Sequence, residues 1–218
     1  MKYKLVIFDL DGTLLNTIDD IANSMNEALT KNGFDPYPTN SYRYFVGQGV
    51  KILVDKVLAN QKHTQEEWQK VYADYMHYYG MWQKNKTKPY QGIQELLLSL
   101  KERGTKVAVL SNKPHADTLQ VVKEYFPDYE FACIFGARPH RQIKPAPDGV
   151  FDILQEVKVK KEETLYVGDT KIDMETATSA DVTAVGVLWG FRDKEELVSA
   201  GANHIISEPQ ELLKLING

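Results

Sequence analysis

The sequence predicts an α/β protein with a parallel sheet and an all-helical insertion, and three observations support this. The chain opens with a short, continuous apolar run, Leu5–Phe8, which is typical of a strand covered on both faces. From Pro89 onward, strand-like runs alternate with helical segments, the order that produces parallel strands joined by right-handed crossovers. Residues 16–87 show helical spacing and no strand signal, so they are expected to form an insertion after the first strand.

The insertion is expected to contain three helices with apolar faces. Apolar residues recur at helical spacing over Ile18–Leu29, and Gly33 would end this first helix. Two further apolar stripes cover Val50–Leu58 and Trp68–Tyr79. Their aromatic side chains are expected in the core of the insertion rather than against a ligand, because such residues are usually buried. A long insertion of this kind is tolerated when its two ends lie close together.

The remaining residues are expected to supply the rest of the sheet and its helices. Further strands are predicted at Lys106–Leu110, Phe131–Phe135, Thr164–Val167 and Val182–Val187, with a short candidate at His204–Ile206. Helices are predicted at Ile93–Leu100, Thr118–Phe126 and Val150–Val157. This alternation of strand and helix is the pattern of a parallel sheet.

Composition limits the classes of function. The chain has 218 residues, enough for about one to two domains, and its 26 basic and 30 acidic residues give a net charge of −4. This balance argues against general binding to nucleic acid or to anionic membranes, and the apolar runs are too short to cross a bilayer. The one cysteine, Cys133, cannot form an internal disulfide, so a reducing cytoplasm is the expected location.

Polar residues follow the predicted strands at their carboxyl ends, where open parallel sheets bind ligands. They comprise carboxylates, a hydroxyl, an amide and an ammonium: Asp9, Asp11, Ser111, Asn112, Lys144, Asp169 and Asp173. Carboxylates that share a crevice raise one another's pKa unless a counter-charge is present. Mg²⁺ suits such oxygen ligands, and the lysine and hydroxyl would hold the remaining oxygens of a phosphate group. The sequence therefore predicts a site for phosphoryl transfer.

Asp9 and Asp11 can divide the work of such a reaction. One carboxylate attacks phosphorus and becomes an aspartyl phosphate, while the other protonates the leaving oxygen and then deprotonates the attacking water. Gly12 permits a turn in which a main-chain N–H approaches the phosphate closely. The same aspartates would be an ordinary helix cap in isolation, so the accompanying motifs decide between the two interpretations.

Four motifs resemble the signature motifs of the haloacid dehalogenase-like phosphohydrolases, in the order of that family. They are Asp9–Leu14 (DLDGTL), Ser111–Lys113 (SNK), Lys144–Pro147 (KPAP), and Gly168–Asp169 followed by Asp173. Any one of them alone would be a weak signal, whereas four in order are a strong one. The resemblance covers nearly the whole chain.

The resemblance implies a Rossmann-like catalytic core made of residues 1–15 and 88–218, and a helical cap made of residues 16–87. It implies magnesium as cofactor and a small-molecule phosphate ester as substrate. The resemblance implies that Asp9 is the nucleophile and Asp11 the general acid/base. It implies phosphate binding by Gly12, Ser111, Asn112 and Lys144. The metal would be bound by Asp9, by Asp169 and by the main-chain carbonyl of Asp11, and Asp173 would support the metal or the lysine.

Two segments resemble one subgroup of this family. Phe45–Gly49 and Gly186–Gly190 are similar to segments of phosphoglycolate phosphatases, which makes 2-phosphoglycolate the first candidate substrate. The cap would then recognise the leaving group through Gly47, Gln48, Gly49 and Lys51. The segment Arg138–Arg141 is more basic than in many relatives and could favour a more anionic substrate.

Other functions stay open at this point. An inorganic pyrophosphatase and a phosphosugar mutase are the enzyme alternatives within the same fold, and a catalytically silent binding module is the alternative from another class. The pattern does not distinguish a monomer from a homodimer.

Overall fold

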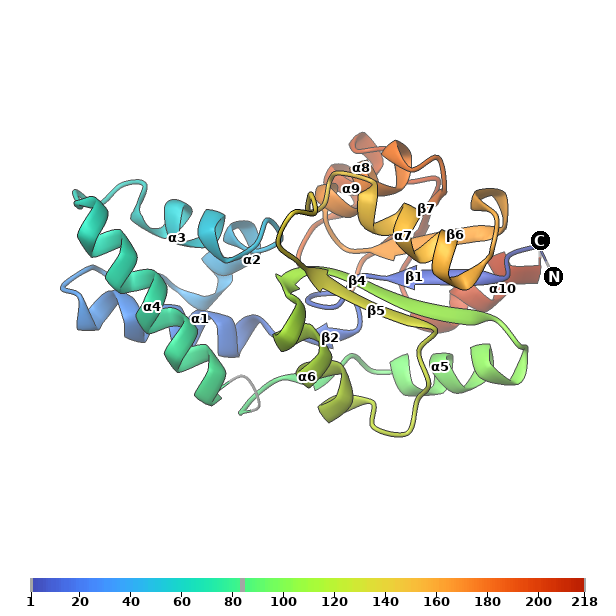
Figure 1. Cartoon of the computed structure of the whole chain (residues 1–218), viewed down its shortest axis with the longest axis horizontal. Coiled ribbons are helices and arrows are strands. Elements are labelled where there is room, and N and C mark those ends of the chain that lie inside the picture. Colours follow the sequence, from blue (N-terminus) through green and yellow to red (C-terminus); the bar gives the residue numbers. More distant parts are fainter. Residues whose placement is uncertain (1, 83–84, 218) are drawn as a thin grey trace. The chain divides into compact units, whose positions relative to one another are not determined.

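The computed structural model describes residues 2–82 and 85–217, which form two compact units (Figure 1). One unit joins Met1–Leu15 to Pro89–Gly218 and contains the parallel sheet. The other, Asn16–Lys88, contains the inserted helices. Within the part of the chain that is described, no helix combines the length and the apolar character needed to cross a membrane.

The first unit is built on a six-stranded parallel sheet, which confirms the predicted α/β class. Its strands are β1 (Leu5–Phe8), β4 (Lys106–Pro114), β5 (Cys133–Ala137), β6 (Thr164–Gly168), β7 (Thr183–Val187) and β8 (His204–Ile206), in the spatial order β5-β4-β1-β6-β7-β8. The chain builds outward from β1 through β4 and β5, then returns to the other side of β1 for β6, β7 and β8. This reversal beside β1 is a topological switch point, where sheets of this type bind their ligands.

Helices cover both faces of the sheet (Figure 1). One face packs against α5 (Ile93–Glu102), α6 (His115–Tyr125) and α10 (Leu212–Asn217), and the other against α7 (Asp148–Val157), α8 (Lys171–Ser179) and α9 (Lys194–Ser199). Alternate residues of β1 serve the two faces: Val6 and Phe8 join the first apolar cluster, Leu5 and Ile7 the second. All four are fully buried, which explains why the strand is a continuous apolar run.

The inserted unit consists of α1 (Ile18–Lys31), α2 (Tyr42–Phe45), α3 (Val50–Leu58) and α4 (Gln65–Trp82). Their apolar stripes form one buried cluster that includes Tyr75 and Tyr79, which lie in the core as predicted, and also Tyr42, which the predicted stripes did not include. The connecting segments β2 (Leu15–Asn16) and β3 (Lys88–Pro89) pair as a two-stranded sheet, a feature that the sequence pattern did not reveal.

A buried carboxylate ties the end of the insertion to its first helix. Asp20, on α1, accepts hydrogen bonds from the amide of Lys86 (3.0 Å to Oδ2) and from the amide and hydroxyl of Thr87 (2.8 Å each). These donors satisfy a carboxylate that is only 1% exposed. The ends of the insertion therefore lie close together, as its tolerance within the fold requires.

Several predicted boundaries were wrong, including those of β4, β5 and α6. The strand expected to stop at Leu110 continues to Pro114, with an irregular register against β5 between these residues. The strand expected from Phe131 begins at Cys133, because Phe131 packs against the rings of Phe126 and Tyr129 instead of joining the sheet. The helix expected from Thr118 begins at His115, immediately after Pro114.

Candidate active site

Asp9 and the turn after it lie at the carboxyl end of β1. The Asp9 amide donates to the carbonyl of Val167 on β6 (2.9 Å), which extends the strand pairing by one residue and fixes the carboxylate at the sheet edge. The chain then turns through Gly12, whose φ of +94° lies in the left-handed region. A Cβ on Gly12 would lie 2.3 Å from Asp169 Oδ2, so only glycine lets this turn lie against Asp169.

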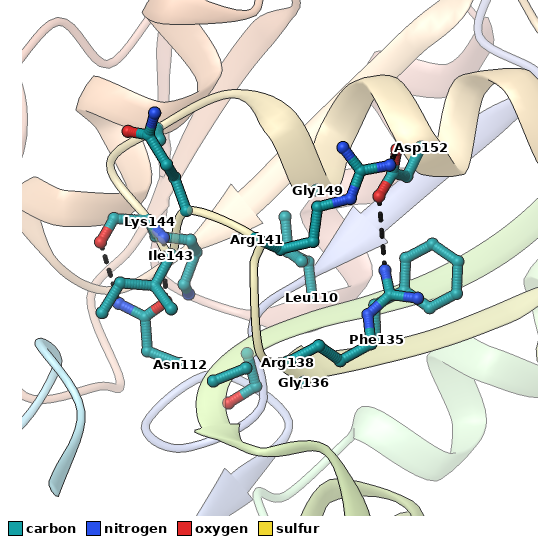
Figure 2. A pocket seen from close by; sticks show the side chains of 14 residues that line it. Leu110, Asn112, Phe135, Gly136, Arg138, Arg141, Ile143, Lys144, Gly149 and Asp152 are labelled. Atoms are coloured by element: carbon teal, nitrogen blue, oxygen red, sulfur yellow. Dashed lines mark hydrogen bonds and ion pairs between the residues drawn. The ribbon is translucent and has the colours of Figure 1, made fainter.

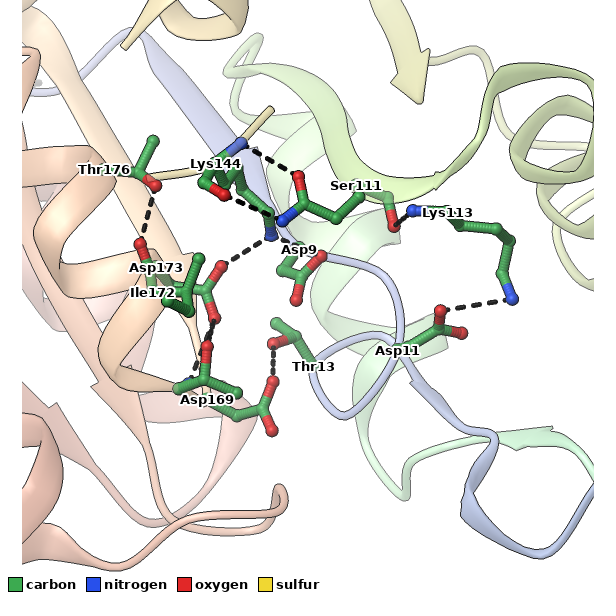
Figure 3. Close-up of polar contacts among 12 residues, drawn as sticks. Asp9, Asp11, Thr13, Ser111, Lys113, Lys144, Asp169, Ile172, Asp173 and Thr176 are labelled. Atoms are coloured by element: carbon green, nitrogen blue, oxygen red, sulfur yellow. Dashed lines mark hydrogen bonds and ion pairs between the residues drawn. The ribbon is translucent and has the colours of Figure 1, made fainter. Parts of the chain in front are cut away.

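Lys144 joins two of the predicted carboxylates (Figure 3). Its Nζ lies 2.8 Å from Asp9 Oδ1 and 2.7 Å from Asp173 Oδ1, and its side chain is 3% exposed. Asn112, on β4, makes two hydrogen bonds to the main chain of Lys144. Its Nδ2 donates to the Lys144 carbonyl (3.0 Å), and its Oδ1 accepts from the Lys144 amide (2.9 Å). Asn112 thus orients Lys144 through the main chain, and its role in binding phosphate stays a prediction.

Asp169 follows β6 and is fully buried. Its Oδ1 accepts a hydrogen bond from the Thr13 hydroxyl (2.9 Å), and its Oδ2 accepts from the Phe191 amide (2.8 Å). Neither donor was recognised from the sequence. Thr13 lies inside the first motif, but nothing local in the sequence connects Phe191 with Asp169.

Asp173 lies in the first turn of α8, where it is also fully buried. Its Oδ2 accepts from the amide and the hydroxyl of Thr170 (3.0 and 2.7 Å), while its Oδ1 faces Lys144. The spacing of Thr170 and Asp173 matches a capping box, which the sequence could have revealed. Asp173 therefore both starts the helix and holds the lysine.

Three carboxylates and one ammonium make up this buried cluster. Asp9, Asp169 and Asp173 offer oxygens that all lie within 4.8 Å of one another. Burial raises the pKa of Asp9 well above its usual value, with Asp173 adding to the rise and Lys144 opposing it. Burial, together with the Asp173 charge, also raises the pKa of Asp169 to about 7. For Lys144, burial alone would lower the pKa, but Asp173 and Asp9 raise it well above its usual value.

The donor set fits a divalent cation. When ionised, three carboxylates paired with one ammonium carry two excess negative charges in a buried place. Hard divalent cations take oxygen ligands of this type, and a dication would offset the charge that burial disfavours. The residues at hand are therefore suited to a metal between Asp9 and Asp169.

Asp11 and Ser111 both contact Lys113, a residue of the second motif for which the sequence suggested no role. Asp11 Oδ2 lies 3.2 Å from Lys113 Nζ, and Ser111 Oγ accepts from the Lys113 amide (3.2 Å). Ser111 and Lys144 line the same small cavity. The functions assigned to Asp11 and Ser111 from the resemblance stay predictions.

The basic segment before Lys144 is held by one carboxylate (Figure 2). Arg138 Nη2 lies 3.3 Å and Arg141 Nη2 2.8 Å from the two oxygens of Asp152, on α7. The Arg138 guanidinium also lies over the ring of Phe135, 4.1 Å from its centroid. Asp152 neutralises one of the two positive charges, so the rim of the site is less basic than the sequence suggested.

The expected leaving-group residues lie in the inserted unit: Gly47, Gln48 and Gly49 directly precede α3, and Lys51 lies in its first turn. Gly47 and Gly49 have φ angles of +117° and +82°, which residues with side chains rarely adopt. Gln48 is half-buried and Lys51 exposed. Their contact with a substrate stays a prediction.

Replacing Lys144 with Met is expected to destabilise the metal-free protein by about 3–5 kcal/mol, because it leaves two buried carboxylates without their cation. Lys144 opposes the rise that burial causes in the pKa of Asp9, so without the ammonium the folded protein keeps the Asp9 carboxyl group protonated at a pH at which the unfolded chain releases the proton. The loss should therefore be larger at pH 8 than at pH 5. Urea unfolding at pH 5 and at pH 8 measures this loss of stability. Lys161→Met is the control, because Lys161 is paired with Asp181 at the surface. Equal losses for the two variants would contradict the role of Lys144.

Known proteins resemble this chain over most of its length. Residues 6–187 match the family model described as haloacid dehalogenase-like hydrolase. A phosphoglycolate phosphatase of Mannheimia succiniciproducens is 29% identical over 99% of both chains. A protein of Caldanaerobacter subterraneus subsp. tengcongensis, provisionally named pyrophosphatase PpaX, is 30% identical over 100% of this chain and 96% of its own.

A crystal structure from Lactobacillus delbrueckii subsp. bulgaricus shows the same fold. It is described as a candidate phosphoglycolate phosphatase, with a TM-score of 0.93 and 31% identity over 99% of both chains. The family match spans the sheet from β1 to β7 and contains the four motifs that carried the resemblance. The chain therefore belongs to the haloacid dehalogenase-like hydrolases.

Proposed function

We propose that the protein is a magnesium-dependent phosphomonoester hydrolase that acts through an aspartyl-phosphate intermediate on a small phosphorylated metabolite. The observation that carries the proposal is the placement of the Asp9 carboxylate. It lies at the switch point of the sheet, 2.8 Å from the Lys144 ammonium and among further carboxylate oxygens. A nucleophile in this setting has a cation beside it and a cluster suited to a metal.

The residues divide the reaction into two steps. An Asp9 oxygen forms a bond to phosphorus while the bond to the leaving oxygen breaks, and Asp11 gives its proton to that oxygen. Asp11, now a carboxylate, takes a proton from water as the water oxygen attacks phosphorus and the bond to Asp9 breaks. Lys144 and Ser111 hold the phosphoryl oxygens, and Asp173 keeps the lysine in position.

A bound Mg²⁺ would neutralise charge on the phosphoryl oxygens. It would be held by Asp9, Asp169 and the main-chain carbonyl of Asp11. The contacts of Thr13 and Phe191 with Asp169 orient that carboxylate for the task. We also propose that residues 1–15 and 88–218 act as the catalytic core, and that residues 16–87 serve as a cap that selects the leaving group.

The first candidate substrate is 2-phosphoglycolate, because a phosphoglycolate phosphatase resembles this chain over its full length. Inorganic pyrophosphate is the second candidate, supported by the resemblance to the protein named PpaX and by the arginine pair next to Lys144. Both substrates carry a negative charge on the leaving group.

The test is phosphate release from a panel of substrates with and without magnesium. The panel contains 2-phosphoglycolate, pyrophosphate, several sugar phosphates and a neutral alkyl phosphate. We expect magnesium-dependent release that is fastest with 2-phosphoglycolate. Fastest release from pyrophosphate would support the second candidate. A sugar phosphate that is isomerised without release of phosphate would point to a mutase, and no reaction at all would contradict the proposed hydrolase.

A further inference from the structure

Lys113 is a buried cation beside the predicted general acid (Figure 3). Its Nζ lies 3.2 Å from Asp11 Oδ2, and the two side chains are 6% and 14% exposed. A lysine this buried is uncommon unless its charge has a partner. The proposed reaction assigns no task to this ammonium, although it lies next to the carboxyl group that acts on the leaving oxygen.

The main chain around Lys113 is held from both sides. Its amide donates to Ser111 Oγ (3.2 Å), and its carbonyl accepts from the Thr118 hydroxyl (3.2 Å). A Cβ on Gly136 would lie 2.6 Å from the Lys113 carbonyl oxygen, so the glycine allows β5 to approach this point closely. The base of the side chain is therefore fixed by the core and does not depend on the inserted unit.

A leaving group that is protonated by Asp11 lies close to the Lys113 ammonium, because both contact the Asp11 carboxyl group. A general acid lies within about 2.6–3.2 Å of the oxygen that it protonates. Asp11 Oδ1 is buried and has no hydrogen-bond partner among the described residues, so it is the oxygen available for that proton transfer. Because Asp11 Oδ2 contacts Lys113, an anionic group two bonds beyond the leaving oxygen comes within reach of the ammonium.

We propose that Lys113 selects substrates whose leaving group carries a carboxylate next to the carbon that bears the leaving oxygen. This inference rests on the proposed phosphomonoesterase activity and names its substrate class. The charge of Lys113 attracts the carboxylate, and its short distance to Asp11 places the leaving oxygen at the acid. Selection of the leaving group then begins in the sheet-containing unit, before any contribution from the inserted helices.

The test compares two substrates of nearly equal size. One is 2-phosphoglycolate, and the other is 2-hydroxyethyl phosphate, in which a hydroxymethyl group replaces the carboxylate. We expect the wild-type protein to favour 2-phosphoglycolate in kcat/KM by about 30- to 100-fold, the range of a charge-assisted hydrogen bond. In Lys113→Met this ratio should fall close to one, mainly through a rise in KM for 2-phosphoglycolate, and Lys113→Arg should keep part of it.

Controls separate selection from folding and from general damage. Lys161→Met removes an exposed lysine of the same unit and should keep the wild-type ratio. Thermal unfolding checks each variant, and Lys113→Gln replaces Lys113→Met if the latter does not fold. An unchanged ratio with equal loss for both substrates would overturn the selection proposal and assign Lys113 to the positioning of Asp11 alone. If the wild-type protein hydrolyses neither ester, the selection proposal is overturned, and the proposed function fails as well only if no member of the substrate panel releases phosphate.

Discussion

Replacement of Asp9 with Asn is expected to abolish turnover, with kcat lower by at least about 10⁴-fold. The amide cannot form the aspartyl phosphate, although its shape is nearly that of the carboxylate. The fold should remain intact, because Lys144 keeps Asp173 as a partner and the change removes one of three clustered negative charges. Phosphate release from the best substrate of the panel measures the loss, and circular dichroism checks the fold.

A matched control and a direct search for the intermediate make this prediction decisive. Asp128→Asn makes the same chemical change at an exposed position and should keep full activity. Mass spectrometry of protein quenched during turnover should show one added phosphoryl group in the wild type and none in Asp9→Asn. Turnover at the wild-type rate by the variant would remove Asp9 from its assigned role as nucleophile.

Replacement of Asp11 with Asn should lower kcat by about 10²- to 10⁴-fold for alkyl phosphates. The leaving alkoxide is a strong base, and without a proton donor it departs slowly. An aryl phosphate such as p-nitrophenyl phosphate needs less help, because its leaving phenolate is a weak base. The loss in the first step should therefore be much smaller for the aryl substrate, and steady-state and burst kinetics on both substrates measure it.

The second step offers an independent check on Asp11. Hydrolysis of the aspartyl phosphate also needs this residue as the base, so Asp11→Asn should accumulate the phosphorylated protein when given the aryl substrate. Asp128→Asn again provides the control. An equal loss with both kinds of leaving group, or no accumulation of phosphorylated protein, would argue against the acid/base role.

The sequence by itself determined the fold class and the set of residues at the sheet edge. The run Leu5–Phe8 predicted a strand buried on both faces, and the structure confirms it because both faces carry helices. Asp9, Lys144 and Asp169 could be chosen from sequence because each lies in a short motif. These motifs lie close together in the structure because they follow neighbouring parallel strands, whose carboxyl ends share one edge of the sheet.

Element boundaries depended on contacts that the local pattern does not contain. Phe131 has the apolar character of a strand residue, but it packs against the rings of Phe126 and Tyr129 and leaves Cys133 to begin the strand. Packing among neighbouring elements overrides local propensity in such cases.

Only the tertiary structure decided which polar groups are partners. Lys113 pairs with Asp11, Asn112 holds the main chain of Lys144, and Thr13 bonds to Asp169, over sequence separations that range from about thirty residues to more than a hundred and fifty. Sequence periodicity reports which face of its own element a residue occupies, whereas a partner on another element depends on how the two pack. Lys113 lies within the second motif, where the sequence suggested no role for it, and its distance to Asp11 is the observation on which the role proposed above rests.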